Sequence, residues 1–440
     1  MSKLLKEKLD LREVKEIFIE GIKESTEELK IGFEYERLPI LSENNQSAPY
    51  EGLDGVCESL RLYARNENWD YLLDKNNIIG LKKLHNTLTL EPGSQMELSI
   101  KPYRSIKKIE EKINELDSTL KPILDEFGIK LLNYGVSVLS TYKNIKLLPK
   151  RRYHIMANYL WGILSDVMMR ETAGIQAGFD YTSEEDAMRK FKIANMLSPF
   201  ATAMFANSPI RGGVDTGYKT FRALAWLNTD SERCGLLLGI NSFNDYINKI
   251  LKTPMIMFQR EDDVHTVNGT MTLEHFINNE YMGEIANLDD FKLSANLYFP
   301  DVRLRKFIEI RNQDCVGKGL QYAILAFYKG ILYSKKSMQD IEELFKDYKP
   351  QDFTELRYNI PKLATQATFT KNKAKDIIKE LLIISENGLK EQNEGEEQYL
   401  EPIQDLSYQG LCPADIILKN WYGTWNKDLN KMIEYLTKEE

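Results

Sequence analysis

The chain has 440 residues, of which 42% are hydrophobic and 28% charged, and its formal net charge is −8 at pH 7. This composition is typical of a globular protein, and the length suffices for one large domain or up to about three smaller ones. The negative charge argues against nucleic-acid binding, which needs a basic surface. No apolar run approaches about 20 residues and the charged start does not resemble a signal peptide, so we expect a cytoplasmic protein outside the membrane.

The cysteines and histidines argue against the common disulfide and zinc sites. The four cysteines are scattered without a CxxC pair, at Cys57, Cys234, Cys315 and Cys412. We therefore expect reduced, structural thiols. The four histidines form no HExxH motif. A bound metal ion would have to be held by carboxylates.

The beginning of the chain changes from a helical to a strand pattern. Residues 1–29 repeat apolar side chains at helical spacing, which predicts a helix. The following stretch, KIGFEYERLPI, alternates with a period of two and predicts a strand. Glu34 and Glu36 share one face of this strand, and Phe33 and Tyr35 share the other. An E-x-E pattern on a strand usually marks a solvent-exposed face, so it indicates a site only together with other residues.

A β-hairpin is expected in the segment LTLEPGSQMELSI. Pro92 and Gly93 form a typical turn between a strand that ends at Glu91 and a strand that begins at Gln95. On the second strand, Gln95 and Glu97 share one face. The turn would bring Glu91 near the same surface.

Two helices and a third strand candidate follow. The pattern predicts one helix over residues 105–126 and another that begins after Ser183 or Thr182 with an acidic first turn. The segment RLRKFIEIRNQD predicts a strand with Glu309 and Arg311 on the same side.

The end of the chain is helical and polar from about residue 337. We expect Trp421 and Trp425 to anchor a final helix in the core, and the charged segment 390–402 to be a solvated loop. The strands are separated by irregular stretches without regular βαβ alternation. The sequence therefore predicts an α+β fold with a helical C-terminal region.

Three strand candidates thus carry carboxylates on their polar faces. Residues on the same face of a strand lie roughly 6.5–7 Å apart, close enough for neighbouring carboxylates to hold cations in one cluster. Oxygen ligands select hard cations such as Mg²⁺, which commonly binds nucleotide phosphates. The pattern is consistent with a Mg²⁺–ATP site, and the alternative is a solvated sheet face.

Several longer blocks resemble the plant and proteobacterial type of glutamate–cysteine ligase. They occur in the order of that family between about residues 30 and 333, and they are IGFEYE, LTLEPGSQMELS, PKRRYHIMANYL, RKFKIANMLSPFATAMFANSPIRGG, FRALAWLNTDSERCG and FPDVRLRKFIEIRNQD. The resemblance implies a glutamine-synthetase-like fold, with a curved, mainly antiparallel sheet that binds ATP, Mg²⁺ and amino acids. In that family, ATP phosphorylates the γ-carboxylate of glutamate, and the amine of cysteine displaces the phosphate.

The resemblance also implies roles for the polar residues of the strands. By this resemblance, the metal ligands would be Glu34, Glu36, Glu91, Glu97 and Glu309. Gln95 would line the ATP site. Arg311 would contact ATP and the transferred phosphoryl group, with Glu309 as its catalytic neighbour. The alternative for Arg311 is a simple ion pair with Glu309.

Substrate binding is implied for a second group of residues. Arg222, Arg233 and Arg152 match arginines of the family, and either Arg222 or Arg233 could instead form a structural salt bridge. Gln176 keeps its register in TAGIQAGFDY, where the family commonly reads TCTVQVNLD. Gly178 departs from the family's asparagine, so the attacking amine could differ from cysteine.

Residues 1–335 are expected to form the catalytic domain, with residues 336–440 packed on it as a helical portion. The expected activity is ATP- and Mg²⁺-dependent ligation of glutamate to cysteine. One alternative is a related ligase with another acid or amine in a secondary pathway. A non-catalytic nucleotide-binding descendant is a further alternative. The expected partners are these small molecules, without nucleic acid or membrane, and the oligomeric state stays open.

Overall fold

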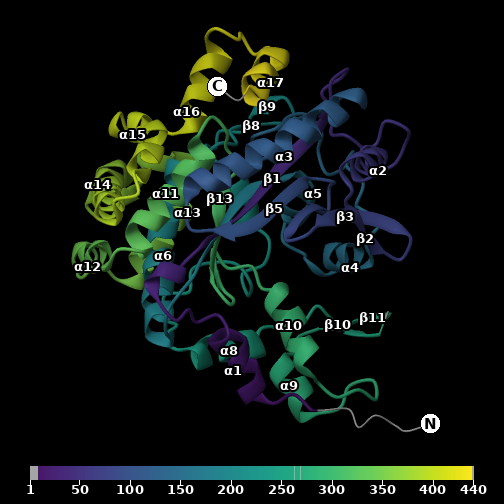
Figure 1. Cartoon of the computed structure of the whole chain (residues 1–440), viewed down its shortest axis with the longest axis vertical. Helices are drawn as coiled ribbons and strands as arrows, with labels where there is room; N and C mark the ends of the chain where they lie inside the picture. The colour runs from purple at the N-terminus through teal and green to yellow at the C-terminus, as the bar shows by residue number, and fades with distance from the viewer. Residues whose placement is uncertain (1–7, 262, 268, 439–440) are drawn as a thin grey trace.

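A large antiparallel sheet forms the centre of the computed structural model, which describes residues 8–261, 263–267 and 269–438 (Figure 1). Its strand order is β12-β13-β7-β1-β5-β4-β3-β2, and β6 pairs with the end of β1. The strands are β1 Ile31–Leu41, β2 Asp70–Asp74, β3 Asn77–Lys83, β4 Asn86–Leu90, β5 Met96–Tyr103, β6 Ile129–Leu132, β7 Gly174–Phe179, β12 Val302–Leu304 and β13 Ile308–Asp314. Three small ribbons pair β8 Ile210–Arg211 with β9 Val214–Asp215, β10 Met257–Arg260 with β11 Asp263–Thr266, and β14 Thr368–Phe369 with β15 Asn372–Lys373.

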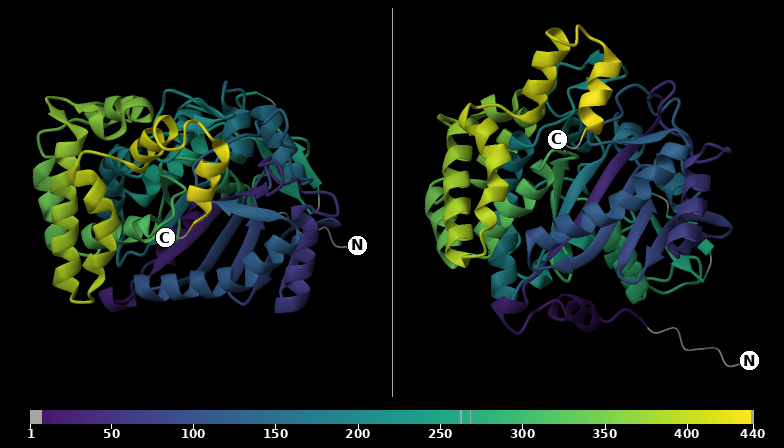
Figure 2. Two further views of the ribbon diagram at one scale, coloured as in Figure 1. Left: turned by 90° about the horizontal axis from the view of Figure 1, so that it is seen from above. Right: turned by 45° about the horizontal axis from the view of Figure 1, so that its top comes forward.

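Helices surround this sheet, and those between residues 320 and 408 stand along one side of it (Figure 2). The first ten are α1 Leu11–Ile19, α2 Val56–Glu67, α3 Ile106–Glu126, α4 Arg151–Tyr159, α5 Ser165–Glu171, α6 Glu184–Met204, α7 Phe221–Leu227, α8 Phe243–Lys252, α9 Leu273–Asn278 and α10 Leu288–Asn296. The others are α11 Leu320–Leu332, α12 Lys335–Leu344, α13 Pro350–Leu363, α14 Ala374–Gln392, α15 Glu401–Tyr408, α16 Pro413–Tyr422 and α17 Leu429–Thr437. The predicted α+β architecture with a helical C-terminal region is confirmed. No helix among the described residues is long and apolar enough to cross a membrane.

The alternation predicted for β1 is confirmed. Phe33 and Tyr35 are buried, and the Phe33 ring packs 6.3 Å from the ring of Tyr322 on α11. Glu34 and Glu36 face the opposite side of the sheet. Because β1 lies between β5 and β7, its acidic face continues onto both neighbours, and Glu36 stands directly across from Glu97.

Several local predictions hold because they rest on turn and capping chemistry. The β4–β5 hairpin turns at Pro92 and Gly93. Helix α3 begins after Ser105, and α6 begins after Ser183, whose Oγ accepts the N–H of Asp186 at 3.0 Å. The four cysteines are free, as expected.

The predicted helix over residues 1–29 is wrong in its extent. Residues 1–7 lie outside the described residues, and α1 ends at Ile19. A Cβ on Gly21 would lie 2.3 Å from the carbonyl oxygen of Lys306, so the chain passes against the β12–β13 hairpin there. Ile22 then forms a bridge with Tyr181, which replaces helical hydrogen bonding.

Two other elements are divided where the sequence predicts one. The segment RLRKFIEIRNQD is a hairpin of β12 and β13, in which Arg303 pairs directly with Glu309. The final helix is two helices, α16 and α17, separated near Asn426 and Lys427, which both have positive φ. Trp421 and Trp425 are nevertheless buried, as predicted.

The prediction of a solvated loop over residues 390–402 is wrong. Helix α14 extends to Gln392, and a short 3₁₀ helix follows at Glu396–Leu400. Glu396 is buried, and its carboxylate accepts hydrogen bonds from the backbone of Ile106 at 2.7 Å and from Lys329 at 2.5 Å. A charged sequence can be buried where a distant partner neutralises it.

We expect Lys329→Met to lower the free energy of unfolding by about 3 kcal/mol, because it leaves a buried carboxylate without its cation. The side chains of Lys329 and Glu396 are only 1% and 5% exposed. Thermal denaturation followed by circular dichroism measures the effect. As a matched control, Lys336→Met removes an exposed pair with Asp340 and should change stability by less than about 1 kcal/mol. Equal melting temperatures for both variants would contradict this prediction.

Candidate active site

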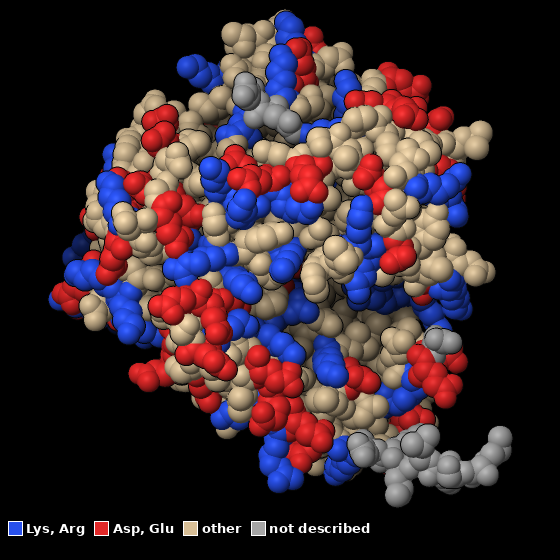
Figure 3. Space-filling model, in the orientation of Figure 1, with Lys and Arg blue, Asp and Glu red and all other residues tan. Residues whose placement is uncertain are grey.

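A cleft of about 1160 Å³ lies over the acidic face of the sheet. In Figure 3, Lys and Arg side chains gather around the hollow near the centre of the face shown. One side of the cleft is acidic and comes from β1, β5 and the β4–β5 turn, with Glu34, Glu36, Glu91 and Glu97. The other side is basic and comes from α4, α7 and the β12–β13 hairpin, with Arg152, Arg222, Arg303, Arg305 and Arg311.

The acidic side carries more negative charge than its surroundings neutralise. Burial raises the pKa of Glu34 to about 7, and the charge of Glu309 adds to this effect. Burial also raises the pKa of Glu97, with Glu34 and Glu91 as further causes. The pKa of Glu36 is raised by burial too, although Arg222 and the N–H of Gly174 oppose the shift. A cation in this part of the cleft would relieve the repulsion.

The donor set and the charge deficit suit a hard divalent cation, since every acidic side chain here offers oxygen ligands. Among the residues that the structure describes, no three such side chains already converge closely enough to hold a metal ion. Cation binding would therefore have to draw the carboxylates together.

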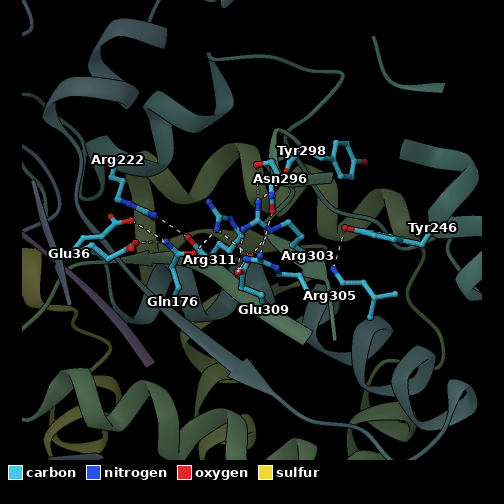
Figure 4. A network of polar contacts seen from close by, with 12 residues as sticks. Glu36, Gln176, Arg222, Tyr246, Asn296, Tyr298, Arg303, Arg305, Glu309 and Arg311 are labelled. Atoms are coloured by element: carbon cyan, nitrogen blue, oxygen red, sulfur yellow. Dashed lines mark hydrogen bonds and ion pairs between the residues drawn. The ribbon is translucent and has the colours of Figure 1, made fainter. Parts of the chain in front are cut away.

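The basic side is organised around Glu309 (Figure 4). Its Oε2 accepts from Arg303 Nε at 2.6 Å and from Arg311 Nη1 at 3.2 Å, and its Oε1 accepts from Arg305 Nη1 at 3.1 Å. Burial alone would raise the pKa of Glu309, but the three arginines, Arg303 first among them, hold it far below its ordinary value. The lowered pKa favours the ionised carboxylate, which accepts hydrogen bonds from three guanidinium groups that line the cleft.

Gln176 joins the two sides. Its Oε1 accepts a hydrogen bond from Arg311, and its Nε2 donates to Glu36 Oε1 at 3.0 Å. Figure 4 shows it between these two side chains. Its neighbour in register on β1 is Glu34. An amide suits this position because it can accept from a cation and donate to a carboxylate simultaneously.

Gln95 lines the cleft, but both polar atoms of its side chain form hydrogen bonds with backbone groups. Its Oε1 accepts from the N–H of Gly93 at 2.7 Å, and its Nε2 donates to the carbonyls of Met169 and Thr172 at 3.1 and 2.9 Å. These bonds hold the β4–β5 turn against the end of α5. They place Glu91 at the rim of the cleft.

The three arginines proposed for substrate binding differ in their surroundings. Arg233 does not line the cleft, and it forms an ion pair with Asp230 at 2.9 Å. Arg152 and Arg222 do line the cleft. The buried Nε of Arg152, and both Nε and Nη1 of Arg222, have no hydrogen-bond partner within the described part of the chain. Unpaired buried donors favour Arg152 and Arg222 over Arg233 as sites for an anion.

Gly178 lies beside the cleft, in a smaller hollow of about 490 Å³ that Glu34, Gln176 and Glu309 also line. The ring of Phe307 covers this glycine, and a Cβ at residue 178 would lie 2.8 Å from the ring carbon Cδ2. The ring of Phe307 therefore occupies the space that a side chain at residue 178 would fill.

Sequence reasoning missed Arg303 and Arg305, which complete the basic side. The signal was present as R-x-R before the E-x-R of Glu309 and Arg311. The prediction of a single strand over RLRKFIEIRNQD did not place these two arginines next to Glu309. A turn between the arginines and Glu309 brings both onto the same carboxylate.

Comparisons with known proteins agree with this fold. A solved glutamate–cysteine ligase of Francisella tularensis in complex with AMP matches with a TM-score of 0.60 at 14% identity, covering 93% of this chain and 87% of that one. A bifunctional glutathione synthetase of Pasteurella multocida matches with a TM-score of 0.56 at 11% identity, covering 95% of this chain and 52% of that one. These two matches show that the chain shares the fold of these proteins.

The sequence comparisons identify the family. The chloroplastic glutamate–cysteine ligase of Arabidopsis thaliana is 30% identical over 416 residues, which are 92% of this chain and 79% of that protein. Glutamate–cysteine ligase B of Oryza sativa subsp. japonica is 29% identical over 418 residues, 93% of this chain and 84% of that protein. The profile of glutamate-cysteine ligase family 2 matches residues 30–434. The chain belongs to glutamate-cysteine ligase family 2.

Proposed function

We propose that this protein is an ATP- and Mg²⁺-dependent ligase that activates the γ-carboxylate of glutamate as an acyl phosphate and joins it to the amine of cysteine. Family membership supports the reaction. The observation that carries the proposal is the cleft itself, in which an under-neutralised carboxylate side faces a cluster of arginines. Such a division suits a cation–phosphate complex next to an anionic substrate. The cytoplasmic location and the absence of nucleic-acid partners stay predictions.

In this proposal, Glu34, Glu36, Glu91 and Glu97 hold Mg²⁺, which when bound supplies positive charge to the phosphate oxygens. Glu309 was expected to be a metal ligand as well. Both of its oxygens already accept from arginines, so its role toward a metal would require one of these bonds to open. We assign it first to positioning Arg303 and Arg311.

Arg311 is proposed to stabilise the phosphoryl group during transfer, because fixed guanidinium donors stabilise developing negative charge. Its Nη1 is held between Gln176 and Glu309. Arg152 and Arg222, with their unpaired N–H groups, are proposed anchors for substrate carboxylates. Gln95 would act on ATP only indirectly, through the turn that it holds.

Product analysis tests the activity directly. The protein is incubated with ATP, Mg²⁺, glutamate and cysteine, and in parallel with a mixture of other amines, and the products are identified by mass spectrometry. We expect γ-glutamylcysteine together with ADP and phosphate. Glutamate-dependent turnover that does not use cysteine would support the alternative of another acceptor. Absence of ATP binding in calorimetry with Mg²⁺ present would contradict both enzymatic functions.

We expect Glu34→Gln to stabilise the protein at pH 8 in the absence of Mg²⁺. Burial raises the pKa of Glu34 from 4.5 to about 7, so the folded protein holds a proton that the unfolded chain releases, and stability falls as pH rises through this window. Glutamine cannot ionise, so the variant does not lose stability in this way as pH rises. It should also reduce the increase in melting temperature that Mg²⁺ gives to the parent protein.

Differential scanning fluorimetry between pH 5 and 8, with and without Mg²⁺, measures both effects. Glu126→Gln, at an exposed position at the end of α3, is the matched control and should behave like the parent. If Mg²⁺ does not change the melting temperature of the parent protein at pH 8, this result would argue against the cation site.

A further inference from the structure

The cleft-facing side of β7 carries one side chain, that of Gln176, between two glycines. Gly174, Gln176 and Gly178 alternate along the strand and therefore share one face. Glu34 of β1 stands beside Gln176 on this face. Neither glycine has a positive φ, so the backbone conformation does not require glycine at either position. Both positions instead leave space directly above a strand at the floor of the cleft.

The space above Gly174 is filled by the guanidinium group of Arg222, which reaches it from α7. A Cβ on residue 174 would lie 2.6 Å from Cζ and 2.8 Å from Nε of Arg222. Nη2 of Arg222 donates to the carbonyl of Arg311 on the neighbouring strand β13 at 3.0 Å. The guanidinium group thus lies on the backbone of β7, and a side chain at residue 174 would have to displace it.

Two carboxylates on the strands beside β7 attract this guanidinium group toward the floor of the cleft. Glu36 of β1 accepts the N–H of Gly174 at 2.5 Å, and Figure 4 shows Arg222 next to it. Asp314 of β13 is the register partner of Gly174. Burial raises the pKa of both carboxyl groups, and the charge of Arg222 is the largest effect that opposes the shift. Both carboxylates accept hydrogen bonds from other groups, so Nε and Nη1 of Arg222 have no acceptor within the described part of the chain.

The place of this guanidinium group matters because Arg222 is one of the two proposed anchors for substrate carboxylates. Arg222 lines the cleft, and its two unpaired N–H groups determine how far above β7 a carboxylate can bind. A Cβ at residue 174 would move the guanidinium group away from the strand and turn its donors. The strand itself is held by its hydrogen bonds to β1 and β13, whereas an arginine side chain has many rotamers.

We propose that Gly174 is a positioning residue, whose missing side chain lets the guanidinium group of Arg222 lie where it binds the carboxylate of one amino-acid substrate. This inference rests on the proposed function. It gives Gly174 no contact with substrate and no part in the chemical step. A side chain at residue 174 weakens the binding of that one substrate, while phosphoryl transfer beside Arg311 continues.

Gly174→Ala tests this assignment in steady-state kinetics, with glutamate, cysteine and ATP varied in turn. We expect KM for only one of the two amino acids to rise about tenfold or more, because the other carboxylate is anchored elsewhere. The KM for ATP and kcat should change less than about threefold. Gly239→Ala, at an exposed position where a Cβ would meet no atom within 4 Å, is the matched control and should behave like the parent. Unchanged KM values for both amino acids, or equal increases for all three substrates, would overturn the proposal.

A double-mutant cycle with Arg222→Lys separates the space above residue 174 from other effects of the exchange. Lysine lacks the planar guanidinium group that the added Cβ would displace. The N–H of residue 174, which binds Glu36, is the same in glycine and alanine. We therefore expect Gly174→Ala to raise the same KM less than about twofold in the Arg222→Lys background. An equal increase in both backgrounds would show that the alanine acts through Glu36 or the strand, and would overturn the proposal.

Circular dichroism measures the folding of the single and the double variant. We expect both to fold like the parent, because the atoms closest to the added Cβ belong to a movable side chain. If Gly174→Ala alone fails to fold, a folded double variant would support the clash with the guanidinium group. Unfolding of both would contradict the proposal, because the strand itself would then not accept a Cβ. A parent protein that forms no amide would instead contradict the proposed function.

Discussion

Glu36→Gln is expected to lower kcat for amide formation at least about a hundredfold while the protein stays folded. Glu36 lies at the junction of the two sides of the cleft, where its oxygens accept from Gly174 N at 2.5 Å and from Gln176 Nε2 at 3.0 Å. Glutamine has the same shape and can keep one of these bonds. It removes the charge that the proposed cation requires.

Product formation measured by mass spectrometry, together with circular dichroism, separates the loss of activity from unfolding. A fully active Glu36→Gln protein would refute the metal assignment. Glu309→Gln should also abolish activity, but the structure adds a cost in stability. Its buried charge is the shared partner of three arginines, so a lower melting temperature is expected there and not for Glu36→Gln.

Arg311→Lys is expected to lower kcat about a thousandfold, as for other arginines that stabilise a transferring phosphoryl group. Lysine keeps the charge but offers no planar fork of donors, so it cannot bind Gln176, Glu309 and a phosphate in fixed directions. The KM for ATP should change much less than kcat, because the interaction strengthens in the transition state.

Steady-state kinetics with varied ATP test this expectation. Arg151→Lys serves as the control, because Arg151 is exposed and pairs with Asp263 outside the cleft. A variant at residue 311 that retains more than a tenth of the parent kcat would contradict the proposed role.

Local signals explain why the acidic side of the cleft could be predicted from the sequence. The period of two in β1 assigns Glu34 and Glu36 to one face, and the Pro92–Gly93 turn fixes the β4–β5 register, in which Glu97 faces Thr89. Both depend on neighbouring residues alone. The basic side depends on a turn inside RLRKFIEIR that carries no glycine or proline, so the pattern of one strand concealed it.

Long-range contacts explain the remaining differences. Glu396 can be buried because Lys329, which lies 67 residues earlier, pairs with it. The residues near Glu396 in the sequence do not indicate this partner. The surroundings of Arg222 are equally invisible, because its apolar neighbours in FRALAW do not show which partners its N–H groups meet, whereas the partner of Arg233 lies only three residues before it. Only the fold shows that Arg233 is paired with Asp230 while two N–H groups of Arg222 are free of protein partners in the described structure.

The contact between Gly178 and Phe307 has a consequence for how this site can evolve. An asparagine at residue 178 would collide with the ring of Phe307 unless residue 307 became smaller in the same lineage. The two positions should therefore covary among homologues, with a glycine accompanying an aromatic residue and a larger side chain accompanying a small one. A larger side chain at residue 178 would then require a paired substitution, in which residue 307 becomes smaller first, because the clash arises only while the ring is present.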